Sequence, residues 1–132
     1  MGRVVYQGFQ ALSVPADATC DVWSLFAAST NRVKILGWEL SSAAVAADII
    51  ACHLHRISAV GSVGSSSTTE EKSNEADAAI TANVRTLDTT AGTDAGLLQG
   101  FQWEQLGPLT QIYTPEMAPI SLVSEGFALT WD

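Results

Sequence analysis

The fold is decided by residues 32–58, RVKILGWELSSAAVAADIIACHLHRIS. Two apolar runs rich in β-branched and aromatic residues flank a connector of small residues, which is the composition of two strands joined by a loop. The second run alternates, with Ile50, Cys52 and Leu54 on one face and its two histidines on the other. Such alternation is typical of an antiparallel strand with one buried face. We interpret the stretch as the central pair of strands of a β-sandwich, with the histidines pointing away from the core.

Two details modify this interpretation of the stretch. The apolar side chains of the first run change face near Gly37, which predicts a β-bulge at that glycine. The connector SSAAVAAD has weak strand propensity and contains two adjacent serines, so it predicts a loop rather than a helix.

Short strand-like runs separated by turn residues occur on both sides of this stretch. Residues 19–28 carry large apolar groups on both faces, which indicates a strand covered by the core on one side and by a loop or partner on the other. Residues 59–78 are predicted as a long polar loop and residues 88–96 as a turn-rich loop. Further strands are predicted within residues 79–87 and 97–109, and three short ones within residues 110–132.

An N-terminal arm brings the total to about eight short strands, with turn signals at intervals of about ten residues. This pattern predicts an all-β protein: a single-domain antiparallel β-sandwich or jelly roll over residues 15–132, preceded by an arm over residues 1–14. Such arms often pack on a neighbouring subunit. A short edge strand of the same sheet is an equally good interpretation of the arm.

The composition favours a protein that assembles and argues against binding to nucleic acid. Hydrophobic residues make up 47% of the 132 residues and charged residues only 15%, so an oligomer, whose subunits hide surface from water, fits better than a monomer. With 14 acidic residues against 6 Lys and Arg, the net charge of −8 repels polyphosphate, so we expect no direct contact with nucleic acid. We find no signal peptide or membrane anchor pattern and expect a protein that is made in the cytoplasm and does not bind membranes.

Few residues suggest chemistry, and each has a structural alternative. His53 and His55 point to the same side of a strand, as two metal ligands would, but no third ligand accompanies them at a recognisable spacing. We therefore favour histidines that face solvent or an interface, where they would make assembly pH-sensitive. Cys52 lies on the expected core face without a matched base, so we expect a packed thiol rather than a nucleophile. We predict no catalytic residue, no metal and no cofactor.

Two other groups of residues also have a structural explanation. The segment GSVGSSSTTEEK lacks the Lys of a phosphate-binding loop and the ligand spacing of a calcium loop, so it is interpreted as a solvated loop. Packing in the core or at an interface explains the tryptophans, because each lies in a strand-like run; a carbohydrate platform would need two of the rings exposed side by side. The four are Trp23, Trp38, Trp103 and Trp131.

The order of these features resembles that of a known family. A strand of the form RVKILGWELS is followed by a connector of small residues and by a strand that ends in Arg, as in HLHRIS. A Gly/Ser/Thr-rich loop, GSVGSSSTTEEK, comes next, and the chain continues with FQWEQLGPL, YTPEMAPISL and GFALTWD. From about Val22 onward, this order is similar to that of the small capsid decoration (cement) proteins of tailed bacteriophages, which have jelly-roll or sandwich-like folds.

The resemblance implies a non-enzymatic virion protein that binds the exterior of an assembled capsid and reinforces its lattice. Its partners would be the major capsid protein and further copies of the chain, with a homotrimer as the expected assembly. Head-fibre, neck and tail proteins use similar sandwiches, so a module that recognises a host-surface carbohydrate is the alternative. A third interpretation, a small β-barrel enzyme of the cupin type, requires His53 and His55 as metal ligands.

Subunit contacts are expected in the arm first, and then in one strand and in the segment between the last predicted strands. The arm residues are Val4, Val5, Tyr6 and Phe9, and the secondary choices are Trp23, Tyr113, Pro115 and Met117.

Overall fold

The computed structural model describes residues 5–7, 21–62, 70–72, 76, 81–86 and 88–131. Within these residues the chain forms nine β-strands and no helix, so the predicted all-β class is confirmed. The strands are β1 (Val5–Gln7), β2 (Trp23–Phe26), β3 (Gly37–Leu40), β4 (Ile49–Ala59), β5 (Glu70–Lys72), β6 (Asn83–Thr86), β7 (Thr93–Glu104), β8 (Leu109–Ile112) and β9 (Gly126–Trp131).

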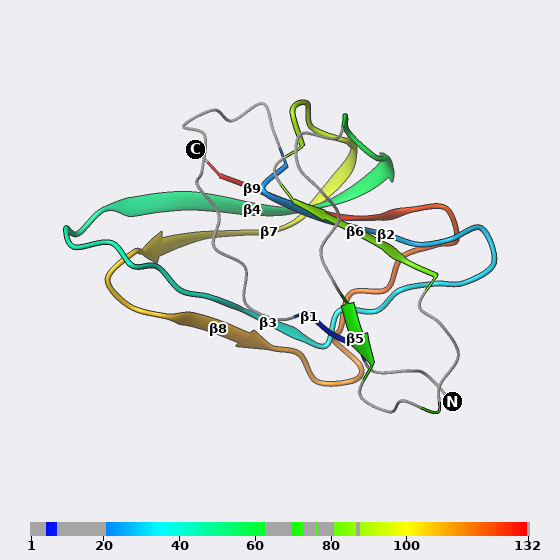
Figure 1. Cartoon of the computed structure of the whole chain (residues 1–132), viewed down its shortest axis with the longest axis horizontal. Coiled ribbons are helices and arrows are strands. Elements are labelled where there is room, and N and C mark those ends of the chain that lie inside the picture. Colours follow the sequence, from blue (N-terminus) through cyan, green and yellow to red (C-terminus); the bar gives the residue numbers. More distant parts are fainter. Residues whose placement is uncertain are drawn as a thin grey trace.

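The strands form three antiparallel sheets. The largest has five strands in the order β6-β2-β9-β4-β7, and the two-stranded sheet β3-β8 faces it to complete a β-sandwich (Figure 1). The third sheet is the pair β1-β5. β3, β8 and the residues after β8 cover the inner face of the large sheet. Their positions therefore determine which parts of that face are exposed to water.

The core lies between the two facing sheets. Leu54 of β4 and Phe127 of β9 pack on Ile35, and Cys52 of β4 packs with Trp103 and Leu129. The predicted core face of β4 is therefore confirmed. Cys52 is a free, fully buried thiol, and burial raises its pKa to about 11, so it stays a protonated packing group at neutral pH.

The prediction that residues 32–58 form the central pair of strands is wrong. The two runs become β3 and β4, which lie in different sheets and face each other across the core, while β9 occupies the centre of the large sheet. The connector at residues 41–48 is a loop, as predicted, and it joins the two layers at one end of the molecule (Figure 1). Alternation shows which face of a strand is buried but carries no information on which strand is its neighbour.

Two local predictions also need correction. The pairing of β3 with β8 runs without a register shift, so Gly37 is not a bulge; a side chain there would come within 2.8 Å of the Gln111 carbonyl oxygen, and the glycine permits this close approach. Irregular pairing occurs instead between β4 and β7, where the register shifts after Leu54, Arg56 and Ile57. The turn-rich residues 88–96 do not form only a loop, because β7 begins at Thr93.

The polar segment at residues 59–78 contains a strand that its composition did not predict. Its β5 strand pairs antiparallel with β1, with Tyr6 opposite Glu71. The rest of residues 1–14, including Val4 and Phe9, lies outside the described residues. Val5 and Tyr6 thus belong to a strand pair within their own chain.

Candidate interaction surface

The segment that follows β8, residues 113–120, is fixed to the sandwich at several points; we call it the strap. The Tyr113 amide donates to the Leu36 carbonyl at 2.9 Å, and the Ile35 amide donates to the Pro119 carbonyl at 3.0 Å. Two cations add to these backbone bonds. Lys34 Nζ donates to the Pro115 carbonyl at 2.6 Å, and Arg56 Nη1 to the Ile120 carbonyl at 2.7 Å. The strap therefore holds its shape without a partner.

This fixed segment presents large apolar side chains to water. Met117 of the strap is 74% exposed, and Ile112, the last residue of β8, is 78% exposed beside it. They border a groove of about 700 Å³ that also includes Leu98 of β7 and Ile120. Its lining contains the Arg56 cation and no carboxylate, although the whole chain has a net charge of −8. An apolar, preformed groove of this kind is typical of a protein-binding surface.

Of the residues predicted for subunit contacts, the structure exposes some and half-buries others. Pro115 and Met117 are exposed on the strap. Tyr113 is half-buried: its hydroxyl accepts from Trp38 Nε1 at 3.3 Å and donates to Gln99 Oε1 at 2.9 Å. Trp23 is half-buried and packs against both core clusters.

Of the arm residues, the structure describes only the backbone positions of Val5 and Tyr6, on β1. Sequence reasoning missed Ile112 and Ile120. Both stand in strand-like runs where an apolar side chain is normally assigned to the core, and nothing in the pattern distinguishes the two cases.

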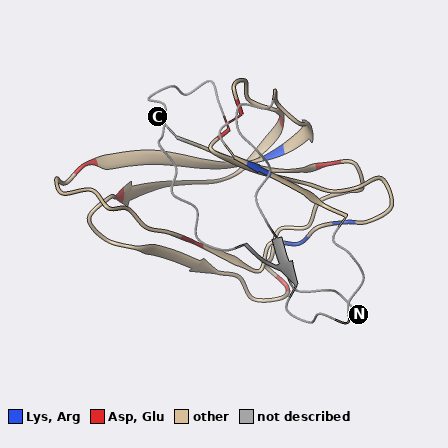
Figure 2. Ribbon diagram, viewed as in Figure 1, with Lys and Arg blue, Asp and Glu red and all other residues tan. Residues whose placement is uncertain are grey.

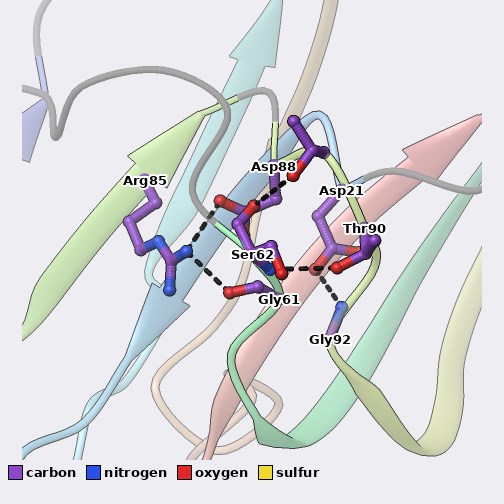
Figure 3. Close-up of polar contacts among 8 residues, drawn as sticks. Asp21, Gly61, Ser62, Arg85, Asp88, Thr90 and Gly92 are labelled. Atoms are coloured by element: carbon purple, nitrogen blue, oxygen red, sulfur yellow. Dashed lines mark hydrogen bonds and ion pairs between the residues drawn. The ribbon is translucent and has the colours of Figure 1, made fainter.

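A buried polar cluster lies on the opposite face of the five-stranded sheet from the core (Figure 3). Arg85 of β6 is only 5% exposed, and its Nη2 atom lies 3.0 Å from Asp88 Oδ1 and donates to the Gly61 carbonyl at 2.7 Å. The carboxylate of Asp21 accepts from the Gly92 amide at 2.8 Å. Burial raises the pKa of both Asp21 and Asp88, and the nearby Arg85 charge opposes that rise.

The cluster joins chain segments rather than presenting a reactive group. It ties Asp21, two residues before β2, the strand β6 and the β6–β7 connection to the residues that follow β4, where Ser62 forms a bridge with Thr90 (Figure 3). Asp21, Arg85 and Asp88 are all buried, so a substrate has no access to them in this conformation. The signal that could have found the cluster is a charged residue within an apolar strand run, as at Asp21 and Arg85, since a buried charge requires a partner.

The two histidines point away from the core, as predicted. Their rings lie 6.1 Å apart. His55 Nε2 lies 2.8 Å from Thr130 Oγ1, and its Nδ1 lies 3.5 Å from Asp94 Oδ1. This hydroxyl, imidazole and carboxylate follow the order of a hydrolytic triad. Hydrolysis by a triad also needs a substrate cleft and oxyanion donors. These three residues line neither the groove at the strap nor the hollow beside Asp48.

We therefore assign no reaction to these side chains. In the part of the chain that the structure describes, no three His, Cys, Asp or Glu side chains gather as metal ligands would.

Among the described tryptophan side chains, none forms an exposed platform with another. Trp38 is half-buried and stacks on Phe101 with ring centroids 4.9 Å apart, and Trp103 is buried with its Nε1 donating to the Gly107 carbonyl. The side chain of Trp131 lies outside the described part of the structure.

Comparisons with known proteins leave the assignment to the physical evidence: no protein family, curated protein or solved structure matches this chain. The residues that the structure describes contain no helix long and apolar enough to span a membrane.

Proposed function

We propose that this chain is a non-enzymatic structural protein of a phage particle, which decorates or cements the capsid exterior by binding the major capsid protein and further copies of itself. The observation that supports this proposal is the fixed, apolar strap and its groove. A side chain such as Met117 is exposed to water without being needed in the chain's own core, which is the property of a surface that a partner covers.

Preorganisation of the strap strengthens the argument. A partner loses less free energy in ordering a segment whose backbone is already bonded to Leu36 and Ile35 than it would in ordering a free loop. On a shell, an interface of modest area is repeated many times, so even weak individual contacts stabilise the whole lattice. The acidic net charge of −8 suits a position on the exterior better than contact with packaged DNA.

The proposal is tested by binding purified protein to undecorated capsids of the phage or prophage that encodes it, followed by sedimentation and electron microscopy. We expect the natural chain to sediment with the shells. The double variant Ile112→Ser/Met117→Ser should lose at least about tenfold in affinity, because it removes apolar area from the groove. Both positions are exposed, so the free energy of unfolding should change by no more than about 0.5 kcal/mol.

Leu97→Ser is the matched control, since Leu97 is exposed on the other side of β7, opposite His55, and outside the groove. It should bind like the natural chain. A natural chain that ignores the shells contradicts the proposal, and so does a double variant that binds as tightly as the control.

A further inference from the structure

A second apolar surface lies at the end of the molecule where β3 is connected to β4 and β7 to β8 (Figure 1). Val45 is 99% exposed, and Ile49 and Leu106 are also exposed. An open hollow here is lined by Ala47, Asp48, Ile49 and Glu104, so two carboxylates stand beside the apolar side chains. The two carboxylates belong to neighbouring chain segments, because Ile49 pairs with Glu104 and the Gln105 amide donates to the Asp48 carbonyl at 3.0 Å. We call this surface the acidic end.

Cations gather at the other end, beside the strap, where β2 is connected to β3 (Figures 1 and 2). Arg32 and Lys34 are exposed and flank Val33. The Val33 carbonyl accepts from the Ser121 amide at 2.9 Å, and the Val33 amide donates to Ser121 Oγ at 3.1 Å. Lys34 also forms a backbone bridge with Ile120. Exposed apolar side chains of Ile120 and Leu122 therefore lie next to two positive charges. We call this surface the basic flank.

We propose that the acidic end of one copy of this chain docks on the basic flank of the next. This inference rests on the self-association included in the proposed function and names the two surfaces that carry it. Each surface has exposed apolar side chains; the acidic end adds the carboxylates of Asp48 and Glu104, and the basic flank adds the cations of Arg32 and Lys34. The aliphatic part of the Arg32 side chain fits the apolar walls of the hollow while its guanidinium meets Asp48 and Glu104.

The charges determine which copies can meet. Two chains that each carry −8 repel one another overall, so association requires a local match of opposite charges. The two surfaces lie at opposite ends of the sandwich (Figure 1), so the contact is head to tail and uses different patches on the two copies. Contacts of this type close into rings when the rotation between copies permits, which is the geometry of a cyclic trimer.

Charge reversal with rescue tests the contact, with the dissociation constant of the purified chain measured by sedimentation velocity or light scattering. Arg32→Glu and Glu104→Lys should each weaken self-association by about tenfold or more, because each places like charges together. The double variant Arg32→Glu/Glu104→Lys should regain the natural affinity. Glu104→Lys is the decisive single variant. It changes the net charge from −8 to −6, since replacing −1 with +1 adds two. If only the overall repulsion between copies mattered, this variant would associate more tightly than the natural chain.

Ser58→Lys is the matched control, because it adds a positive charge at an exposed position of β4 that is remote along the strand from Ile49. It should not weaken association, and circular dichroism of all variants verifies that each is folded. A natural chain that is monomeric at every concentration, a Glu104→Lys chain that associates as tightly as the natural one, or a folded double variant without rescue overturns the inference. Shell binding is measured separately. A chain that binds shells without self-association contradicts this inference but not capsid binding. A chain that self-associates through this contact but does not bind shells contradicts capsid binding but not this inference.

Discussion

At the scale of single residues, Arg85 is notable as a buried cation. Its guanidinium is buried together with two carboxylates, those of Asp21 and Asp88. Burial raises the pKa of both carboxyl groups above the usual 3.8, so the folded chain keeps protons that the unfolded chain has already released. Their contribution to stability is therefore complete below the unfolded pKa and is lost as the pH rises through the raised folded pKa.

Replacing this cation tests the account. Arg85→Met leaves two buried carboxylates without a cation and should cost about 3–5 kcal/mol of folding free energy at pH 7. The loss should shrink near pH 4, where more of the carboxyl groups are protonated and uncharged. Urea denaturation at the two pH values measures the difference, with the exposed Arg32→Met as a control that changes stability by no more than about 0.5 kcal/mol. An equal loss at both pH values would show that Arg85 acts by packing alone.

At the scale of elements, the five-stranded sheet depends on close contact between β2 and β9. Gly126 begins β9 and lies opposite Phe26. A methyl group at Gly126 would clash with the Leu25 carbonyl oxygen and stand 2.8 Å from the Phe26 Cα atom. Both neighbours are backbone atoms, which cannot rotate away as a side chain can. The glycine thus permits the close approach of β9 to β2, next to the core residue Phe127.

Gly126→Ala should therefore destabilise the fold by about 1–3 kcal/mol through overpacking. The matched control is Gly107→Ala in the β7–β8 turn, where an added methyl group meets no atom within 4 Å, and we expect a change within about 0.5 kcal/mol. Thermal unfolding of the two variants provides the comparison. Equal midpoints would mean that β2 and β9 can separate locally at no cost.

At the scale of the whole molecule, the sandwich is unequal, with five strands in one layer and two in the layer that faces it. The small sheet has few backbone bonds to lose, because its pairing covers only Gly37–Leu40 and Leu109–Ile112. The central strand β9 is bonded on both sides, to β2 and to β4. The two layers should therefore differ in local stability.

Native-state hydrogen exchange measures this difference. We expect the amides of β9 and of the paired part of β4 to exchange only through global unfolding, and those of β3, β8 and the connector at residues 41–48 to exchange through local opening with a smaller free energy. Shell-bound or self-associated protein should show slower exchange at the strap than the free chain. Uniform protection across both layers would contradict the expected order.

Local alternation determined several features that the structure confirms. The sequence by itself was enough to predict the all-β class, the core face of β4 with Cys52 and Leu54, and the connector at residues 41–48. These features depend on the period of two along a strand and on local backbone preference, both of which are present in a short window of residues.

Other features were decided only by the tertiary structure. The sheet order, the close approach at Gly37, the buried cluster around Arg85 and the exposure of Ile112 all depend on segments that are distant in the sequence. An apolar residue in a strand has the same appearance in the sequence whether a second layer covers it or not. Ile112 stands on the exposed side of β8, away from the side on which Leu109 packs on the core, and Met117 stands on the strap; their exposure depends on how the layers pack and supports the proposed role in assembly.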